Sequence, residues 1–181
     1  HGGKNGDRVV ARLVRWAKED RRPVGKIESI LDAAHEIDLA MKEILVDAGF
    51  PLQFEDEVME ETAVLSDTIS EADLKSRLDF RDVLTFTIDP IDAKDFDDAL
   101  SFRKLENGHF EIGVHIADVS HFVKPGSALD KSAYQRATSV YLPDRVNPML
   151  PERISNELCS LRPHEDKFTF SAVFELDENA K

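Results

Sequence analysis

The chain has 181 residues, a formal net charge of −13 and 41% hydrophobic residues, a size and composition that exclude a wholly disordered chain. Its one cysteine, Cys159, excludes an internal disulfide framework and a multi-cysteine zinc site, and no apolar run approaches the roughly 18 residues of a membrane span. No N-terminal signal pattern is present, which predicts a cytoplasmic protein. The acidic balance argues, at first sight, against a nucleic-acid partner.

The charge is distributed unevenly along the chain. Residues 1–31 contain 8 basic and 4 acidic side chains, a net charge of +4. Residues 32–82 contain 4 basic and 15 acidic side chains, net −11, and residues 83–181 contain 11 basic and 17 acidic side chains, net −6. We therefore treat these three segments as different in kind.

The basic segment predicts two strands. Residues 6–16 and 23–31 contain alternating and β-branched apolar residues, joined by the polar stretch from Ala17 to Pro23. Two strands are not stable alone in water, so we expect the end of a small β-domain whose beginning is missing. Its basic residues and Trp16 either contact a phosphate backbone or form a solvated strand face.

The acidic middle segment is predicted to be helical. Six apolar residues recur at helical spacing before Gly49 ends the pattern: Ile37, Ala40, Met41, Ile44, Leu45 and Ala48. A second helix is expected from about Glu55 to Leu65, and Ser70 followed by Asp73 indicates the N-cap of a short third one. The acidic surplus is interpreted as a solvated face.

The last segment predicts a mixture of strands and helices, which gives an α+β fold class. Residues 84–88 form a predicted strand, and two alternating runs on either side of Asn107-Gly108 predict a β-hairpin. Helices are expected over 129–137 and 152–161, and strands over 139–143 and 168–176. The apolar face of the second of these helices comprises Ile154, Leu158 and Leu161.

Five aspartates crowd into ten positions between two predicted strands: Asp89, Asp92, Asp95, Asp97 and Asp98. Like charges held so closely must either protonate or surround a cation. Oxygen ligands without a nearby cysteine favour a hard cation, Mg²⁺ or Mn²⁺. An exposed acidic loop that binds nothing is the simplest alternative.

Two other interpretations of this acidic loop fit the residues less well. A calcium loop of the EF-hand type that starts at Asp95 would have Ala99 and Leu100 at its fifth and sixth positions, and one that starts at Asp89 would have Ile91 at its third. A lone aspartyl nucleophile would not need four companions. The remaining interpretation is a site with one or two metal ions that acts on phosphates.

Four motifs within residues 84–163 resemble, in order, the catalytic (RNB) domain of the ribonuclease II and ribonuclease R family, and the bacterial ribonuclease R branch most closely. They read TIDPIDAKDFDDALS, GVHIADVSHFV, ATSVYLPDRVNPMLPE and SNELCSLRP. The N-terminal piece resembles the end of the second cold-shock (OB) domain in this family. The resemblance implies three parts: the last strands of a cold-shock/OB β-barrel over 1–31, an acidic helical linker or start of the catalytic domain over 32–82, and the truncated N-terminal part of the catalytic domain over 83–181.

This resemblance implies a hydrolase that degrades RNA from 3′ to 5′, releases nucleoside 5′-monophosphates and uses Mg²⁺. The family's pattern D-x₅-D-x-D-D falls on Asp89, Asp95, Asp97 and Asp98 and leaves out Asp92. It implies that Asp89 and Asp98 bind the metal directly, that Asp95 supports the metal site, and that the loss of Asp97 harms the chemistry most.

The family also has an aromatic residue at the 3′-terminal nucleotide, which corresponds here to Tyr141; stacking suits an enzyme without base specificity. The implied partner is the 3′ end of single-stranded RNA, and neither a membrane nor an obligate protein partner is implied. The family's catalytic domain is about twice as long as the matching part here, and its later motifs include a second aromatic residue and an arginine. We therefore expect the 181-residue chain alone to be inactive or nearly so.

Two rival functions remain open at this point. One is an RNA-binding module that has lost hydrolysis, against which the four intact aspartates argue. The other is an unrelated phosphatase with an aspartyl nucleophile, which would form a phosphoenzyme.

Several further polar residues have structural and functional interpretations. His115, Asp118 and His121 recur every three residues, as metal ligands would, but a structural role is expected for them. Cys159 is expected to be a buried, inert thiol. Four arginines could line an RNA path or form surface ion pairs: Arg136, Arg145, Arg153 and Arg162.

Overall fold

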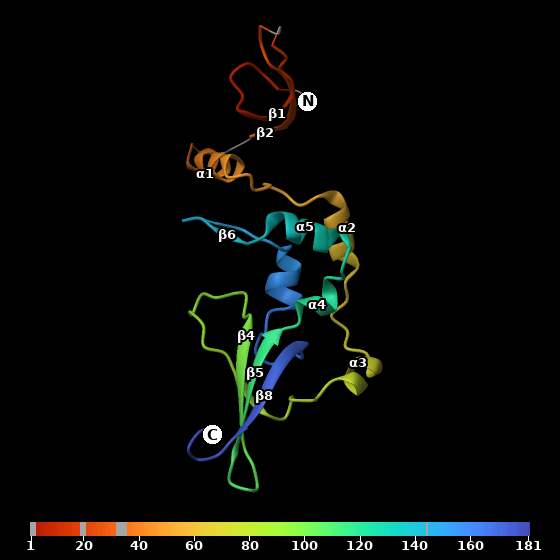
Figure 1. The fold of residues 1–181 in the computed structure, drawn as a ribbon, viewed down its shortest axis with the longest axis vertical. Helices are drawn as coiled ribbons and strands as arrows, with labels where there is room; N and C mark the ends of the chain where they lie inside the picture. The colour runs from red at the N-terminus through yellow and green to blue at the C-terminus, as the bar shows by residue number, and fades with distance from the viewer. Residues whose placement is uncertain (1–2, 19–20, 32–35, 144) are drawn as a thin grey trace. The chain divides into compact units, whose positions relative to one another are not determined.

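A computed structural model of the chain describes residues 3–18, 21–31, 36–143 and 145–181 (Figure 1). The chain divides into two compact units, His1–Gln53 with Tyr141–Asn147, and Phe54–Val140 with Pro148–Lys181. Helices combine with antiparallel sheets, which confirms the α+β class. The predicted boundary after Leu31 adjoins residues 32–35, which lie outside the described residues. Within the described ranges, no helix has the length and apolar character needed to cross a bilayer.

The first unit begins with the predicted pair of strands. β1 (Val9–Arg15) pairs antiparallel with β2 (Val24–Ile30), although part of the predicted connection, residues 19–20, lies outside the described residues. α1 (Glu36–Asp47) follows, and Gly49, with a φ of 82°, ends it as predicted. β6 (Val140–Tyr141) and β7 (Val146–Asn147) form a separate two-stranded sheet.

The predicted apolar face of α1 is partly wrong. Leu45 is buried as expected, but Ile37 and Ile44 are 66% and 52% exposed. The partly buried side of the helix instead carries Asp38, which pairs with Lys42 at 3.0 Å and with Arg145. Hydrogen bonds from these two cations hold the pKa of Asp38 below its usual value. These ion pairs, together with Leu45, decide which side of α1 faces the unit, and hydrophobic spacing alone could not show this.

The second unit begins with two short helices and a strand. α2 (Asp56–Val64) and α3 (Glu71–Ser76) lie where they were predicted. The Ser70 side chain accepts a hydrogen bond from the Asp73 backbone, and Asp73 reciprocates, which forms a capping box. β3 (Leu84–Phe86) ends two residues before the predicted Ile88, because pairing with the next strand stops at Phe86.

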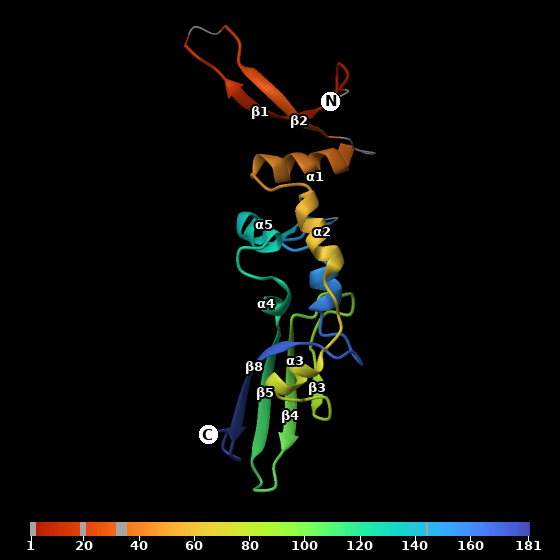
Figure 2. The same cartoon turned by 90° about the vertical axis from the view of Figure 1, so that its right-hand side faces the viewer.

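Four antiparallel strands form the main sheet, in the order β3-β4-β5-β8 (Figure 2). β4 (Asp98–Lys104) and β5 (Phe110–Ala117) form the predicted hairpin, and Gly108 takes the positive φ of 87° that its turn requires. β8 (Thr169–Leu176) pairs with β5 along its whole length. The helix α3 lies beside one face of this sheet (Figure 2).

The core of this unit lies among its helices. α4 (Val119–Phe122), α5 (Ala128–Arg136) and η1 (Arg153–Leu158) surround the fully buried side chains of Leu129 and Ile154. η1 is wound more widely than an α-helix, since the Cys159 amide donates to the Ile154 carbonyl five residues back. The helix predicted over 152–161 ends at Leu158 in the structure. Leu158 is part of the core, whereas Leu161 lies beyond the helix and is half-buried.

Gly113 in the middle of β5 has no room for a side chain. A Cβ at this position would lie 2.5 Å from Nε2 and 2.8 Å from Cε1 of His115, and still closer to the Ser101 hydroxyl. Gly113→Ala should therefore lower the free energy of unfolding by about 1–3 kcal/mol. Chemical denaturation followed by circular dichroism measures this, with Gly3→Ala, which meets only ordinary contacts, as the control. An unchanged midpoint would mean that His115 and Ser101 move aside freely.

Candidate metal centre in the acidic loop

The acidic loop, residues 87–97, connects β3 to β4, and Asp98 is the first residue of β4. Its second half is fixed by backbone hydrogen bonds to distant segments. The Ala117 amide at the end of β5 donates to the Asp97 carbonyl at 2.9 Å, and the Leu161 amide donates to the Phe96 carbonyl at 2.9 Å. The loop therefore holds its carboxylates on a rigid support.

Three of the other aspartates in this stretch act electrostatically on Asp97. The pKa of Asp97 is raised, first by partial burial of its carboxyl group and then by the charges of Asp95, Asp98 and Asp89. Asp92 is not among the charges that act on it. Asp97 and the three aspartates that act on it are the four residues that the D-x₅-D-x-D-D pattern selects. Asp92 belongs neither to the pattern nor to the charges that act on Asp97.

The donor chemistry of this group fits a hard divalent cation. All four side chains offer oxygen atoms only, which suits Mg²⁺ or Mn²⁺. Across the described residues, no lysine or arginine forms an ion pair with any of them, so their repulsion is not compensated by the protein. Within the same residues, no group of three or more His, Cys, Asp or Glu side chains is placed so that it could hold a metal ion. The metal assignment therefore stays a prediction.

Tyr141, the predicted partner of the terminal nucleotide, belongs to the first unit. It lies at the end of β6, and its side chain is 70% exposed. An exposed ring face is what base stacking needs. Its role in binding stays a prediction.

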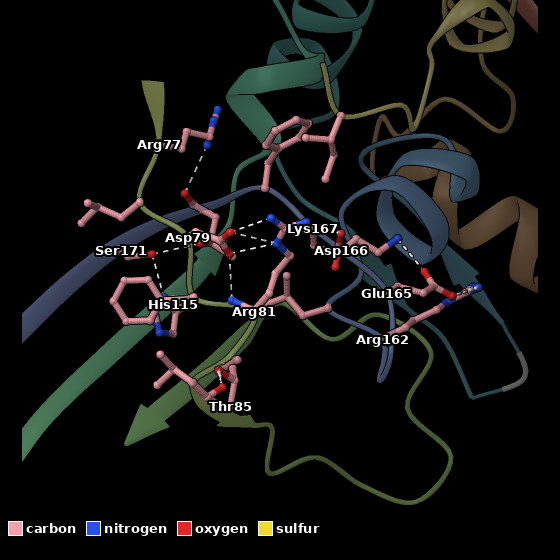
Figure 3. Close-up of a pocket in the computed structure, with 18 of the residues that line it drawn as sticks. Arg77, Asp79, Arg81, Thr85, His115, Arg162, Glu165, Asp166, Lys167 and Ser171 are labelled. Carbon is pink, nitrogen blue, oxygen red and sulfur yellow. Dashed lines mark hydrogen bonds and ion pairs between the residues drawn. The ribbon is translucent and has the colours of Figure 1, made fainter. Parts of the chain in front are cut away.

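A cavity of about 1040 Å³ lies in the second unit (Figure 3). It is lined by α3, the segment leading into β3, residues of all four strands of the main sheet and residues 161–168. Thr87 and Phe96 of the acidic loop also line it, but none of the five aspartates does. Its charged groups neutralise each other: Arg81 pairs with Asp79 at 2.5 Å and with Asp166 at 3.5 Å, and the pKa of Asp79 falls to about 2. This cavity does not have the uncompensated charge of the acidic loop.

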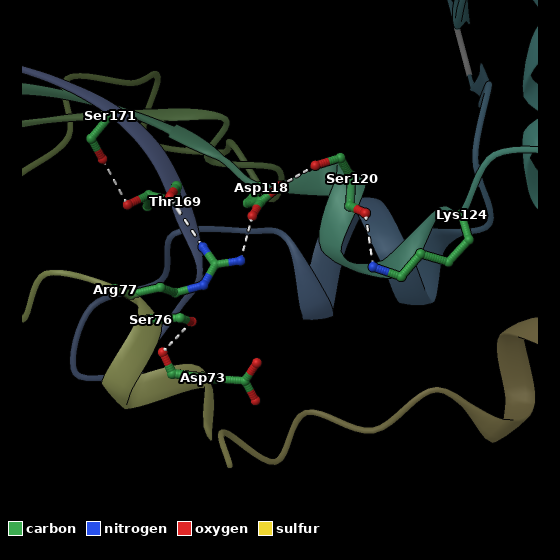
Figure 4. A network of polar contacts seen from close by, with 8 residues as sticks. All are labelled: Asp73, Ser76, Arg77, Asp118, Ser120, Lys124, Thr169 and Ser171. Carbon is green, nitrogen blue, oxygen red and sulfur yellow. Dashed lines mark hydrogen bonds and ion pairs between the residues drawn. The ribbon is translucent and has the colours of Figure 1, made fainter. Parts of the chain in front are cut away.

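A polar network at one side of this cavity joins α3 to the sheet (Figure 4). Arg77 donates to Asp118 at 2.7 Å and to the Thr169 carbonyl at 3.4 Å, and its guanidinium lies 4.5 Å over the ring of Phe168. Burial alone would raise the pKa of Asp118, but hydrogen bonds from Ser120 and Arg77 outweigh it and lower the pKa. Asp118 therefore has the structural role expected for it.

His115 and His121 also have structural surroundings. His115 is buried, and one ring nitrogen lies 2.8 Å from the Ser171 hydroxyl (Figure 3). The other ring nitrogen lies 2.8 Å from the Ser101 hydroxyl. The His121 ring packs 4.0 Å from the ring of Phe168. Neither histidine contacts an aspartate of the acidic loop through a hydrogen bond in the described part of the chain.

These two histidines predict a loss of stability in mild acid. Burial lowers the pKa of His115 and of His121, so the unfolded chain takes up their protons first, near pH 6.5. Because the unfolded state binds more protons in that window, the free energy of unfolding should fall as the pH drops from about 7 to about 5.5. Denaturant unfolding across this range measures the slope.

Cys159 is a buried thiol, as expected. Burial raises its pKa to about 12, which makes the thiolate scarce at neutral pH.

The four arginines considered for an RNA path all have partners within the protein. Arg136 is buried, 3.8 Å over the Phe54 ring, and Arg145 pairs with Asp38. Arg153 donates to two backbone carbonyls of the α2 region, and Arg162 donates to a carbonyl of η1. The ion-pair interpretation holds for Arg145 and for Arg162, which also pairs with Glu165 at 4.0 Å.

Two family descriptions match the chain. Residues 77–181 match the RNB domain, and residues 1–55 match a cold shock domain. Ribonuclease R 2 of Lactococcus lactis is 43% identical over 180 residues, which cover 99% of this chain and 27% of that protein. The chain thus spans about a quarter of the length of this relative.

Solved structures have the same fold. RNase R of Mycoplasma genitalium, in complex with double-stranded RNA, matches with a TM-score of 0.80 and 29% identity over 94% of this chain and 30% of that one. Yeast Ssd1, described as a pseudonuclease, matches with a TM-score of 0.69 and 26% identity over 94% of this chain and 22% of that one. The predicted resemblance and fold are confirmed.

Proposed function

Since this chain belongs to the RNB domain family, we propose that the longer protein that contains it is a metal-dependent 3′→5′ exoribonuclease. The observation that supports this most is the group of four carboxylates in the acidic loop. Partial burial raises the pKa of Asp97 first, and the charges of Asp95, Asp98 and Asp89 raise it further. No cation of the described chain pairs with these four carboxylates. A hydrolase of phosphodiesters would use such uncompensated charge for a metal ion.

In this proposal, Asp89 and Asp98 bind Mg²⁺, Asp95 supports them, and Asp97 lies nearest the chemical step. When bound, the metal would polarise the scissile phosphate and lower the pKa of a water molecule. The protein's own contribution is to fix the backbone at Phe96 and Asp97, next to the carboxylates of Asp95, Asp97 and Asp98. Mn²⁺ could replace Mg²⁺, because both prefer carboxylate oxygens.

The proposed substrate is the 3′ end of single-stranded RNA, with Tyr141 stacking on its terminal base. Each cycle would transfer a water oxygen to the phosphorus and break its bond to the 3′ oxygen of the preceding nucleotide, which releases a nucleoside 5′-monophosphate. The exposure of the Tyr141 ring supports this role, since stacking accepts any base.

The test uses the longer protein with single-stranded RNA labelled at its 5′ end. The label should remain on products that shorten progressively from the 3′ end, and chromatography should find nucleoside 5′-monophosphates. Chelation with EDTA should stop the reaction, and Mg²⁺ should restore it. Internal cleavage, or products with 3′-phosphates, would contradict the proposal.

For the 181-residue chain alone we propose little or no hydrolysis, because it spans 27% of its relative's length. The same assay checks this directly. Robust Mg²⁺-dependent trimming by the 181-residue chain would overturn this part and leave the proposal for the longer protein intact.

The second candidate is an RNA-binding module without hydrolysis, and the similarity to the pseudonuclease Ssd1 favours considering it. The intact D-x₅-D-x-D-D pattern of this chain argues against it. RNA binding by the longer protein without any Mg²⁺- or Mn²⁺-dependent hydrolysis would favour this candidate over the first.

A further inference from the structure

Ser160 lies between η1 and the acidic loop, within the motif SNELCSLRP, and the motif by itself assigns no role to this serine. Its side chain is fully buried. Its hydroxyl accepts a hydrogen bond from the Phe96 amide at 3.0 Å and donates one to the Lys94 carbonyl at 2.9 Å. One hydroxyl therefore bridges the two backbone groups on either side of Asp95.

Two further bonds continue this attachment along the loop. The Leu161 amide, directly after Ser160, donates to the Phe96 carbonyl, and the Ala117 amide donates to the Asp97 carbonyl. The backbone from Lys94 to Asp97 is thus held from two sides. Among these hydrogen-bonding groups of the described chain, only Ser160 acts through its side chain; the others are backbone amides. A substitution can therefore remove the hydrogen bonds of Ser160 but not those of the backbone amides.

The wide winding of η1 explains how Ser160 reaches the loop. The bond from the Cys159 amide to the Ile154 carbonyl closes the last turn with five residues instead of four, and the chain leaves the helix directly at Ser160. Ile154 and Leu158 anchor this turn in the core. The position of the Ser160 hydroxyl is therefore set by the core of the unit and does not depend on the exposed surface.

We infer that Ser160 is a positioning residue for the carboxylates of the acidic loop: its hydroxyl fixes the backbone on both sides of Asp95 and so sets the direction of Asp95 and Asp97. This inference rests on the proposed function where it concerns a bound metal. Groups that hold metal ligands in place by hydrogen bonds, without contacting the metal, commonly lower metal affinity 10- to 100-fold when they are removed.

The experiment measures Mn²⁺ binding to the 181-residue chain by electron paramagnetic resonance of the free ion. Ser160→Ala should raise the Kd for Mn²⁺ by about 10-fold, and Ser160→Thr, which keeps the hydroxyl, should recover most of the affinity. Ser132→Ala is the matched control, because Ser132 is also buried and donates one hydrogen bond, to Glu55, away from the acidic loop. Asp92→Asn controls for non-specific binding to an acidic chain.

A second measurement without metal separates this inference from the proposed function. In amide hydrogen exchange, Ser160→Ala should reduce the protection of Phe96, Leu161 and Ala117 together, whereas Ser132→Ala should not. If Ser160→Ala binds Mn²⁺ as tightly as the wild-type chain, the positioning role is overturned, whatever the thermal stability of the variant.

If the wild-type chain itself binds no Mn²⁺, the proposed metal site is wrong, and the inference is then tested by hydrogen exchange alone. In that case, unchanged protection of Leu161 and Ala117 in Ser160→Ala would overturn the inference as well.

Discussion

Asp97→Asn in the longer protein should reduce RNA hydrolysis by at least about 100-fold and leave RNA affinity nearly unchanged. The reason is that a carboxylate beside phosphate favours the chemical step far more than binding, where its negative charge repels the backbone. Single-turnover assays on labelled RNA measure the rate, and equilibrium titration measures the affinity. Near-normal turnover would show that Asp97 is not part of the reaction centre.

The same substitution should stabilise the metal-free protein at neutral pH. The pKa of Asp97 is raised in the folded state, so its ionised form costs stability above that pKa, and this cost disappears as protonation occurs at lower pH. Replacing the charge with a neutral amide should raise the Tm of the chelated 181-residue chain slightly near pH 7, since Asp97 is solvent-exposed and its charge is screened, and should not change the Tm near pH 3. Asp92→Asn, in the same loop but outside the interacting group, should change neither the rate nor the Tm appreciably. An equal gain from both variants would mean that general charge repulsion, and not the four-carboxylate group, is responsible.

Ile154→Ala should lower the free energy of unfolding by about 2–5 kcal/mol. Ile154 is fully buried in the core among Leu129, Phe122 and Leu158, so its truncation leaves a cavity that the neighbours fill only partly. Because whole proteins are stable by only about 5–15 kcal/mol, this loss would leave the second unit close to unfolding at 37 °C. Chemical denaturation followed by circular dichroism measures the change.

Ile91→Ala is the matched control for this experiment, since Ile91 is fully exposed in the acidic loop. Ile91→Ala removes the same side-chain atoms as Ile154→Ala, but these atoms are in contact with water and not packed in a core. The free energy of unfolding should therefore stay within about 0.5 kcal/mol of the wild-type value. Similar losses from the two variants would mean that Ile154 does not lie in a close-packed core.

Much of the local structure follows from short-range patterns. Asn107-Gly108 between alternating runs predicts the hairpin, because few residues other than glycine accept the positive φ that the turn demands. Ser70 and Asp73 predict the start of α3, since each side chain satisfies a backbone amide of the other. Where the short-range patterns failed, contacts with residues far along the chain determined the structure. Asp38 pairs with Arg145, more than a hundred residues later in the sequence, and this ion pair places a different side of α1 against the unit than its apolar spacing predicts.

The sequence by itself determined the family and the α+β class and predicted the four aspartates, because these depend on residue types at fixed spacing within short segments. Only the tertiary structure decided which aspartates act on Asp97 and what holds the loop beside it. Asp92 is as close in sequence as the others, yet it does not contribute to the raised pKa of Asp97. Ser160 is separated from Phe96 by 64 residues, and no spacing rule relates them. Hydrogen bonds between segments so far apart depend on how the whole chain packs, which local propensity does not specify.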